Sequence, residues 1–423
     1  MKWGNQMLHN SIYLMMATAV MAGLGFFFWI LASRLFSAEM VGLATTLISV
    51  TSLVTSFSLL GLDNGLIRYL PKSENKNSLI NTALTITGLT SVVITVVYLI
   101  FIHTFTPRLL FIRESPVMAV GLVLFTTCYS LNSLFEGVFT ALRKTVYVLA
   151  KNTIFSVVKL VLPVMLVAGG AFGLYMSFGI ATVAAVIMSI LVLMISFGYK
   201  LWPEIHRETV KMMAKFSLGN YLAVFIGGLP ALSLPILITN SLGEKFSAFF
   251  YIDMMIANLL FIIPIAVAQS LFAEGSHDET VVGDHQKQAV KMIAILLIPA
   301  ILVIVFFGQY ILLAFGKQYS AEGDELLRIL AVSGIFVAVT CVGDVILKLK
   351  HQVNKLIIIK VLETAIILGL SFVLRSGGLN GIGTAWMIGT AVTAGIYIGI
   401  NRPGRQSDAR LTAERKPQNR PRE

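Results

Sequence analysis

Several charged and polar residues lie inside long apolar stretches of this sequence, where they could bind an ion or an anionic group. Ionisable side chains are costly in hydrocarbon, so they normally face a cavity or a partner and mark ion or substrate pathways. Carboxylates can take up a proton or a cation, and an ammonium can bind phosphate as a point charge. The candidates for ion coupling are Glu136, Asp344, Asp253 and Glu363, and those for substrate binding are Lys159, Lys360, Arg68 and Asn132.

The positions of these groups suggest different roles. Lys159 lies too deep in its stretch to reach the membrane surface easily, and it could bind a phosphate as a point charge. Lys360 and Glu363 are three residues apart and can pair on one helix face. A bridge between Lys159 and Glu363 across a central cavity is a further hypothesis. Glu136 and Asp344 could bind a coupling ion, or they could make polar contacts between helices.

For the remaining candidates two interpretations also stay open. Asp253 and Asn132 could contact sugar hydroxyls or a cation, or they could form hydrogen bonds between helices. Arg68 could hold a phosphate at the cytoplasmic mouth, or it could only set the topology. The acidic loop 274–284 lacks the ligand spacing of a metal site, and the chain has no Walker loop, so we expect no metal and no cofactor.

The composition of the chain indicates that these residues lie within a membrane. The chain has 423 residues, of which 57% are hydrophobic and only 13% are charged, and its mean hydropathy is +0.84. Soluble domains carry roughly 25% charged residues. About 20 apolar residues cross a bilayer as a helix, which predicts an all-α integral membrane protein with twelve transmembrane helices. These spans are 11–31, 41–61, 79–103, 117–141, 148–169, 172–198, 216–240, 246–273, 289–314, 325–348, 355–375 and 380–400.

The distribution of Lys and Arg predicts the orientation. Cytoplasmic loops are enriched in these residues, and they gather on the side of both termini, so we expect the N- and C-termini to be cytoplasmic. The net charge of +11 is spread over these loops, which argues against nucleic-acid binding. The basic segment 401–423 should be disordered, and it could touch anionic lipid or dock a cytoplasmic partner.

An internal repeat predicts how the helices are grouped. A shift of about 208 residues places Gly170 and Gly173 on Gly378 and Gly381, and Glu136 on Asp344. The chain therefore divides into an N-terminus 1–10, a six-helix lobe 11–198, a linker 199–215, a second six-helix lobe 216–400 and the tail 401–423. Two six-helix lobes that run through the membrane in the same direction indicate a transporter whose lobes rock around a central site.

Short motifs carry a resemblance to a known family. The segments Leu35–Ala44 and Gly61–Pro71 resemble those of the oligosaccharide flippases, or polysaccharide-export proteins. Ser270–His277 and Tyr319–Gly323 are similar as well. This family belongs to the multidrug/oligosaccharidyl-lipid/polysaccharide superfamily, whose fold is shared by the multidrug exporters called MATE. The resemblance covers about residues 5–400.

The resemblance implies that a glycan on a polyprenyl pyrophosphate carrier moves from the inner to the outer leaflet by alternating access. It implies coupling to a proton or sodium ion, a prokaryotic plasma membrane, contact with membrane lipids, and glycan polymerases or glycosyltransferases as partners. A multidrug or metabolite exporter of the same superfamily is the main alternative, followed by a lipid scramblase or an assembly scaffold. None of these functions is enzymatic.

Overall fold

The computed structural model describes residues 2–276 and 282–400, which form helices joined by turns. The predicted tail 401–423 and the centre of the acidic loop lie outside the described residues. The long helices are α1 (Lys2–Leu35), α2 (Ala38–Leu59), α4 (Lys76–Ile100), α7 (Pro116–Ala141), α8 (Val146–Met165), α9 (Gly170–Phe197), α10 (Arg207–Ser241), α11 (Glu244–Gly275), α12 (Val282–Leu313), α13 (Lys317–Leu349), α14 (Val353–Val373) and α15 (Gly378–Ile400).

The predicted all-α membrane fold is confirmed. Among the described residues, eleven stretches are long and apolar enough to cross a membrane. The last of them, Val353–Ile400, contains both α14 and α15, so the long helices match the twelve predicted spans. Helix α10 begins at Arg207 and therefore already includes the second half of the predicted linker 199–215.

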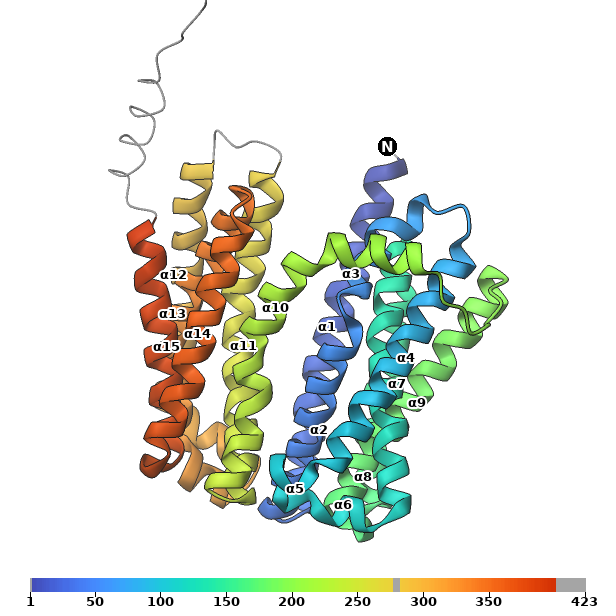
Figure 1. The fold of residues 1–423 in the computed structure, drawn as a ribbon. Coiled ribbons are helices and arrows are strands. Elements are labelled where there is room, and N and C mark those ends of the chain that lie inside the picture. The colour runs from blue at the N-terminus through green and yellow to red at the C-terminus, as the bar shows by residue number, and fades with distance from the viewer. Residues whose placement is uncertain (1, 277–281, 401–423) are drawn as a thin grey trace, which may run out of the picture.

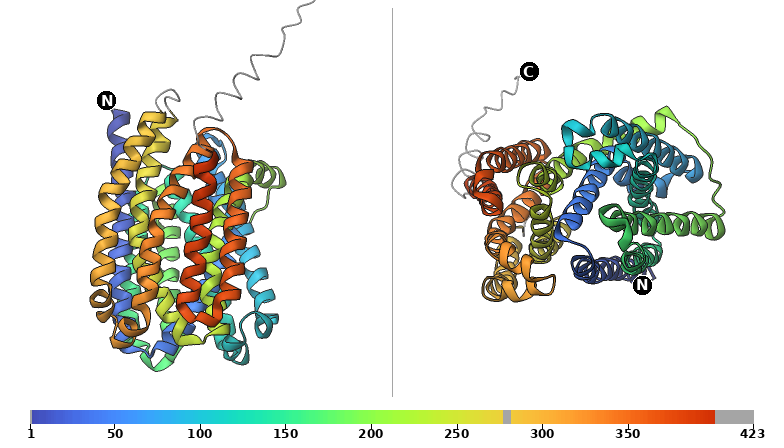
Figure 2. Two further views of the ribbon diagram at one scale, coloured as in Figure 1. Left: turned by 90° about the vertical axis from the view of Figure 1, so that its left-hand side faces the viewer. Right: turned by 90° about the horizontal axis from the view of Figure 1, so that it is seen from below.

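The helices form two bundles that stand side by side (Figures 1 and 2). We call α1–α9 the N-lobe and α10–α15 the C-lobe. Helix α2 packs against both α10 and α11, so it is central to the contact between the lobes. We call the end of the bundle where α1 begins the inner end and the opposite end the outer end, following the predicted orientation.

Short helices connect the long ones. At the inner end, α3 (Leu62–Tyr69) and a 3-10 turn (Leu70–Lys72) join α2 to α4. At the outer end, α5 (Ile102–Phe105), a 3-10 turn (Pro107–Leu109) and α6 (Leu110–Glu114) join α4 to α7. The N-terminal half of α10 crosses from the N-lobe toward the C-lobe at the inner end (Figure 1).

The same glycine turn occurs once in each lobe, as the repeat predicts. A 3-10 turn (Val167–Gly169) joins α8 to α9, and another (Leu374–Gly377) joins α14 to α15. Gly170 and Gly378 follow these turns with φ of +55° and +65°, a backbone conformation that glycine adopts without steric cost. A Cβ at Gly173 or at Gly381 would overlap the carbonyl oxygen of Leu166 or Leu374. The equivalent positions are therefore glycine for the same steric reason.

The segment between the lobes is fastened to α4. The side-chain amide of Asn81 donates to the carbonyl of Lys200 at 3.0 Å, and its oxygen accepts from the backbone N–H of Trp202 at 3.3 Å and from the hydroxyl of Tyr199. The backbone N–H of Glu204 donates to Thr85 at 3.2 Å. These bonds hold residues 199–204 on the N-lobe.

Candidate functional site

A cavity of about 480 Å³ lies between the two lobes. Its walls come from α1 and α8 of the N-lobe and from α10 and α11 of the C-lobe, with Trp29, Pro235, Tyr251 and Asn258 among the lining residues. The lining is largely apolar, and Lys159 is its one charged side chain among the described residues. The structure therefore places a predicted substrate-binding residue in a space that both lobes share.

Phenylalanine rings surround the ammonium of Lys159. Its Nζ lies 4.7 Å from the ring centre of Phe155, 4.9 Å from that of Phe28 and 6.0 Å from that of Phe178. A cation over an aromatic face is attracted by the ring quadrupole within about 6 Å. Within the described part of the chain, Lys159 forms no ion pair. The rings hold the ammonium in place and leave its charge without a carboxylate, so an anionic ligand could neutralise it.

The hypothesis of a bridge between Lys159 and Glu363 is wrong for this structure. Glu363 accepts from Lys360 at 2.8 Å, whereas Lys159 contacts the phenylalanine rings of its own lobe. The predicted pairing of Lys360 with Glu363 on one face of α14 is confirmed. Lys360 also pairs with Asp344 of α13 at 3.0 Å, and Asp344 accepts a hydrogen bond from Tyr397 of α15.

This C-lobe cluster of Asp344, Lys360, Glu363 and Tyr397 joins three helices. The stem of Lys360 also packs on α10, where a Cβ at Gly227 would lie 3.1 Å from its Cδ atom. The side chains of Lys360 and Glu363 are only 13% and 11% exposed. Because water reaches them poorly, each charge needs the other to offset the cost of burial. The cluster holds two carboxylates for one ammonium.

The N-lobe contains the matching ion pair. Lys151 of α8 is fully buried and donates to Asn152 at 2.9 Å, to Asn132 at 3.3 Å and to Glu136 of α7 at 3.4 Å. Glu136 is about half exposed, at 49%. Each lobe thus pairs an acid of its fourth long helix with a lysine of its fifth, which extends the repeat of Glu136 and Asp344. Here one carboxylate faces one ammonium.

Sequence reasoning did not single out Lys151, which the structure places in this buried pair. It lies near the start of the predicted span 148–169, where a lysine can reach the membrane surface, and α8 begins at Val146. The signal was available, since the buried face of α8 includes Val148, Lys151, Phe155 and Lys159 at helical spacing. Lys151 and Lys159 therefore share one face of α8, about 12 Å apart along the helix axis.

Asp253 lies apart from these clusters. It is 1% exposed on α11, and neither carboxylate oxygen has a hydrogen-bond donor among the described residues. It faces the backbone of α13, where a Cβ at Gly323 would lie 2.8 Å from both oxygens. The neighbouring Asp324 pairs with Arg328 at 2.7 Å. A buried carboxylate without a donor requires a proton or a cation.

Arg68 lies outside the central cavity. It is exposed on α3 at the inner end, with its guanidinium 5.8 Å from the ring centre of Tyr69. On the same short helix, burial raises the pKa of the Asp63 carboxyl above its usual range. The structure therefore brings Glu136 and Asn132 together, and Lys360, Asp344 and Glu363 together, while Arg68 remains separate.

Polar contacts fasten the lobes to each other at the outer end. Arg34 of α1 donates to the carbonyls of Leu313 and Ala314, at 2.7 and 3.0 Å, and so satisfies the C-terminal carbonyls of α12. Arg108 pairs with Glu244 of α11 at 3.1 Å. Each contact joins one lobe to the other.

Beneath these pairs, α2 touches the C-lobe backbone. A Cβ at Gly42 would overlap the carbonyl oxygen of Glu244, so only glycine permits this approach. One turn later, the hydroxyl of Thr46 is 2.6 Å from that of Thr239 and 3.3 Å from that of Ser247. The lobes are thus in close contact on the outer side of the cavity.

A family model described as "polysaccharide biosynthesis protein" matches residues 7–266. Among curated proteins, no sequence matches significantly. Many solved structures share the fold at low sequence identity.

A multidrug resistance MATE family transporter in an inward-facing conformation is 15% identical, with a TM-score of 0.71, over 96% of this chain and 99% of that chain. An outward-facing conformation of such a transporter gives 17% identity and a TM-score of 0.66, over 96% of each chain. The lipid II flippase MurJ in an inward closed conformation gives 13% identity and a TM-score of 0.74, over 92% of this chain and 86% of that chain.

Proposed function

We propose that this chain, which belongs to the polysaccharide biosynthesis protein family, is a flippase for a lipid-linked oligosaccharide. Its substrate would be a glycan on a polyprenyl pyrophosphate carrier, moved from the inner to the outer leaflet for the synthesis of a surface polysaccharide. The observation that carries the proposal is Lys159, a cation in the cavity between the lobes. The multi-pass membrane fold is shared with MATE transporters and with a lipid II flippase.

The chemistry of the cavity suits an anionic head group on a lipid. A glycan cannot cross hydrocarbon alone, because each hydroxyl without a hydrogen bond costs several kcal/mol. Lys159 offers the pyrophosphate a charge that the surrounding rings do not neutralise. The apolar walls suit the part of the carrier next to the phosphates. This charge disfavours the alternative function, because an exporter of organic cations would place a cationic substrate against Lys159.

Charge balance favours the C-lobe cluster over the N-lobe pair as the site of ion coupling, and Asp253, which lacks a donor among the described residues, is a second candidate. In the N-lobe pair, Glu136 and Lys151 balance one another. In the C-lobe, Asp344 and Glu363 share the single ammonium of Lys360, so one negative charge remains. A proton or a sodium ion would neutralise it. Binding and release of that ion would change the contacts of Lys360 with α13 and α10. Because α10 also packs against α2 of the N-lobe, such a change would be coupled to movement of one lobe against the other.

The proposed setting follows from the charge bias and the family. Both termini would be cytoplasmic, the membrane would be a prokaryotic plasma membrane, and a polymerase or glycosyltransferases would use the flipped product. Candidate contacts for the sugar are Asn132 near the N-lobe pair and Asn258 in the cavity wall.

Mass spectrometry of membrane lipids tests the proposal in cells that lack the gene and carry a plasmid copy. Cells without a copy, and cells with Lys159→Gln, should accumulate a polyprenyl-linked glycan. A charge-assisted contact of about 1.5–3 kcal/mol corresponds to a loss of flux of about 10- to 100-fold. Lys159→Arg should restore part of the flux.

The matched control is Lys245→Gln. Lys245 also lies over a phenylalanine ring, 4.9 Å from the centre of Phe246, but it is exposed outside the cavity. This variant should behave like the wild type. An unchanged lipid pool in cells without the gene would refute the flippase function. Full activity of Lys159→Gln would refute the role of Lys159.

A further inference from the structure

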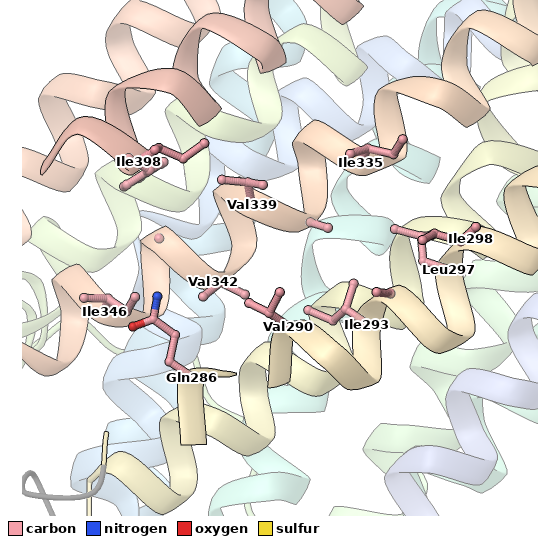
Figure 3. A pocket seen from close by; sticks show the side chains of 14 residues that line it. Gln286, Val290, Ile293, Leu297, Ile298, Ile335, Val339, Val342, Ile346 and Ile398 are labelled. Carbon is pink, nitrogen blue, oxygen red and sulfur yellow. The ribbon is translucent and has the colours of Figure 1, made fainter. Parts of the chain in front are cut away.

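An apolar groove of about 490 Å³ lies on the side of the C-lobe that faces away from the N-lobe. Helices α12, α13 and α15 form it, and these lie on the far side of the C-lobe in Figures 1 and 2. Figure 3 shows the side chains of Val290 and Ile293 from α12 facing Val342 and Val339 from α13. The groove is thus separate from the cavity between the lobes.

The length of the groove matches one leaflet of a bilayer. Its lining on α12 extends from Gln286 to Ile298, which is about 18 Å of helix at 1.5 Å per residue. Half of a hydrocarbon core is about 15 Å thick. Val290 and Ile298 are 51% and 50% exposed, so the groove opens to the surface of the bundle.

The surrounding medium decides what can fill this space. All three helices cross the membrane, so the mouth of the groove opens to hydrocarbon and not to water. An unfilled apolar space loses the dispersion contacts of its walls. A hydrocarbon chain that lies along the groove restores those contacts, and the length of the groove fits a chain that enters from the inner leaflet.

The inner end of the groove is polar and basic. Gln286 is the one amide in its lining. Lys287 and Lys291 are exposed on α12 beside this end, one turn apart, and Lys348 and Lys350 lie where α13 ends. Lysines at the cytoplasmic surface attract anionic lipid head groups, by about 1 kcal/mol each. The head group of a lipid in the groove would lie among these ammonium groups.

We propose that this groove is a binding site for one acyl chain of an anionic phospholipid from the inner leaflet. The bound chain would also support the C-lobe cluster. The ring of Tyr397 forms part of the groove wall, packs directly on Gly343 of α13, and places its hydroxyl on Asp344. A chain in the groove holds that ring in place, so the composition of the membrane would influence the cluster.

Native mass spectrometry of the purified full chain tests the site without any transport substrate. The wild type should retain one anionic phospholipid. Ala294→Phe places a ring in the groove and should retain about tenfold less. Leu296→Phe, on a face of α12 outside the groove, is the matched control and should retain the lipid.

Equal retention by Ala294→Phe and the wild type would overturn the proposal, as would a retained polyprenyl carrier or an uncharged lipid. Lys287→Gln with Lys291→Gln leaves the groove intact and provides a second measurement. In nanodiscs that contain both lipid types, the double variant should keep a bound chain but lose the preference for anionic head groups. An unchanged preference would overturn the assignment of the basic end.

Discussion

Gly42 provides the sharpest test of how the two lobes meet. It lies on α2 of the N-lobe, in contact with the first residue of α11 in the C-lobe. A Cβ built at Gly42 would lie 2.5 Å from the carbonyl carbon of Glu244, whereas carbon atoms in contact are separated by about 3.5–4.0 Å. Gly42→Ala should therefore force α2 and α11 apart by about 1 Å or more.

That separation has a calculable effect. It would stretch the Thr46–Thr239 hydrogen bond from 2.6 Å beyond bonding distance and would also break the 3.3 Å bond between Thr46 and Ser247. Each hydrogen bond contributes about 0.5–1.5 kcal/mol, and overpacking costs about 1–3 kcal/mol. The closed outer end should lose about 2–6 kcal/mol, which lowers its population relative to an open state by about 30-fold or more.

Distances between spin labels measure this shift. Labels at Glu114 of α6 and Glu322 of α13, both exposed at the outer end, report the separation of the lobes after the native cysteines are replaced. Gly42→Ala should add a population at longer distance and should reduce transport. Gly23→Ala on α1, where nothing lies within 4 Å of the added Cβ, should leave the distances unchanged. Identical distributions for Gly42→Ala and the wild type would refute the reasoning.

Three further predictions concern the rest of the structure. Lys360→Met should lower the free energy of unfolding by about 3–5 kcal/mol, because it leaves buried carboxylates without a cation. Adding Asp344→Asn should recover part of that loss in a double-mutant cycle, and additive losses would contradict the pairing. Asn81→Ala should release residues 199–202 from α4 and increase their cleavage by protease by about tenfold or more, because the three hydrogen bonds of the Asn81 side chain are lost. An unchanged cleavage rate would argue against the attachment. Gly343→Ala should displace the ring of Tyr397 and lower the melting temperature, whereas Gly369→Ala, with open space around the added Cβ, should not.

The sequence predicted the fold because hydropathy determines the membrane spans and because the repeat fixes their grouping. The glycines after α8 and α14 could be recognised because both lobes need the same turn. Lys360 and Glu363 could be paired because their spacing on one helix is enough to bring them together. These predictions depend on local geometry or on symmetry, both of which can be read along the chain.

The contacts between helices could not be predicted in the same way. The partner of Lys151 comes from a neighbouring helix, and a position near the end of a span hid its burial. Gly42 carries no sequence signal, since its need for a small residue depends on where α11 begins. The isolation of Asp253 depends on the backbone of α13. Such features follow from how the helices pack, which a single sequence does not specify.

Glycan orientation in reconstituted vesicles tests the central claim most directly. The purified protein would be placed in vesicles that contain the polyprenyl-linked glycan recovered from cells lacking the gene, with an enzyme outside the vesicles that cleaves only the exposed glycan. With the wild-type protein, cleavage should pass beyond the fraction that is exposed at the start and approach completion, while Lys159→Gln should slow this second phase. If cleavage stops at the initial fraction with the wild type, or continues equally without protein, the chain is not a flippase for that lipid.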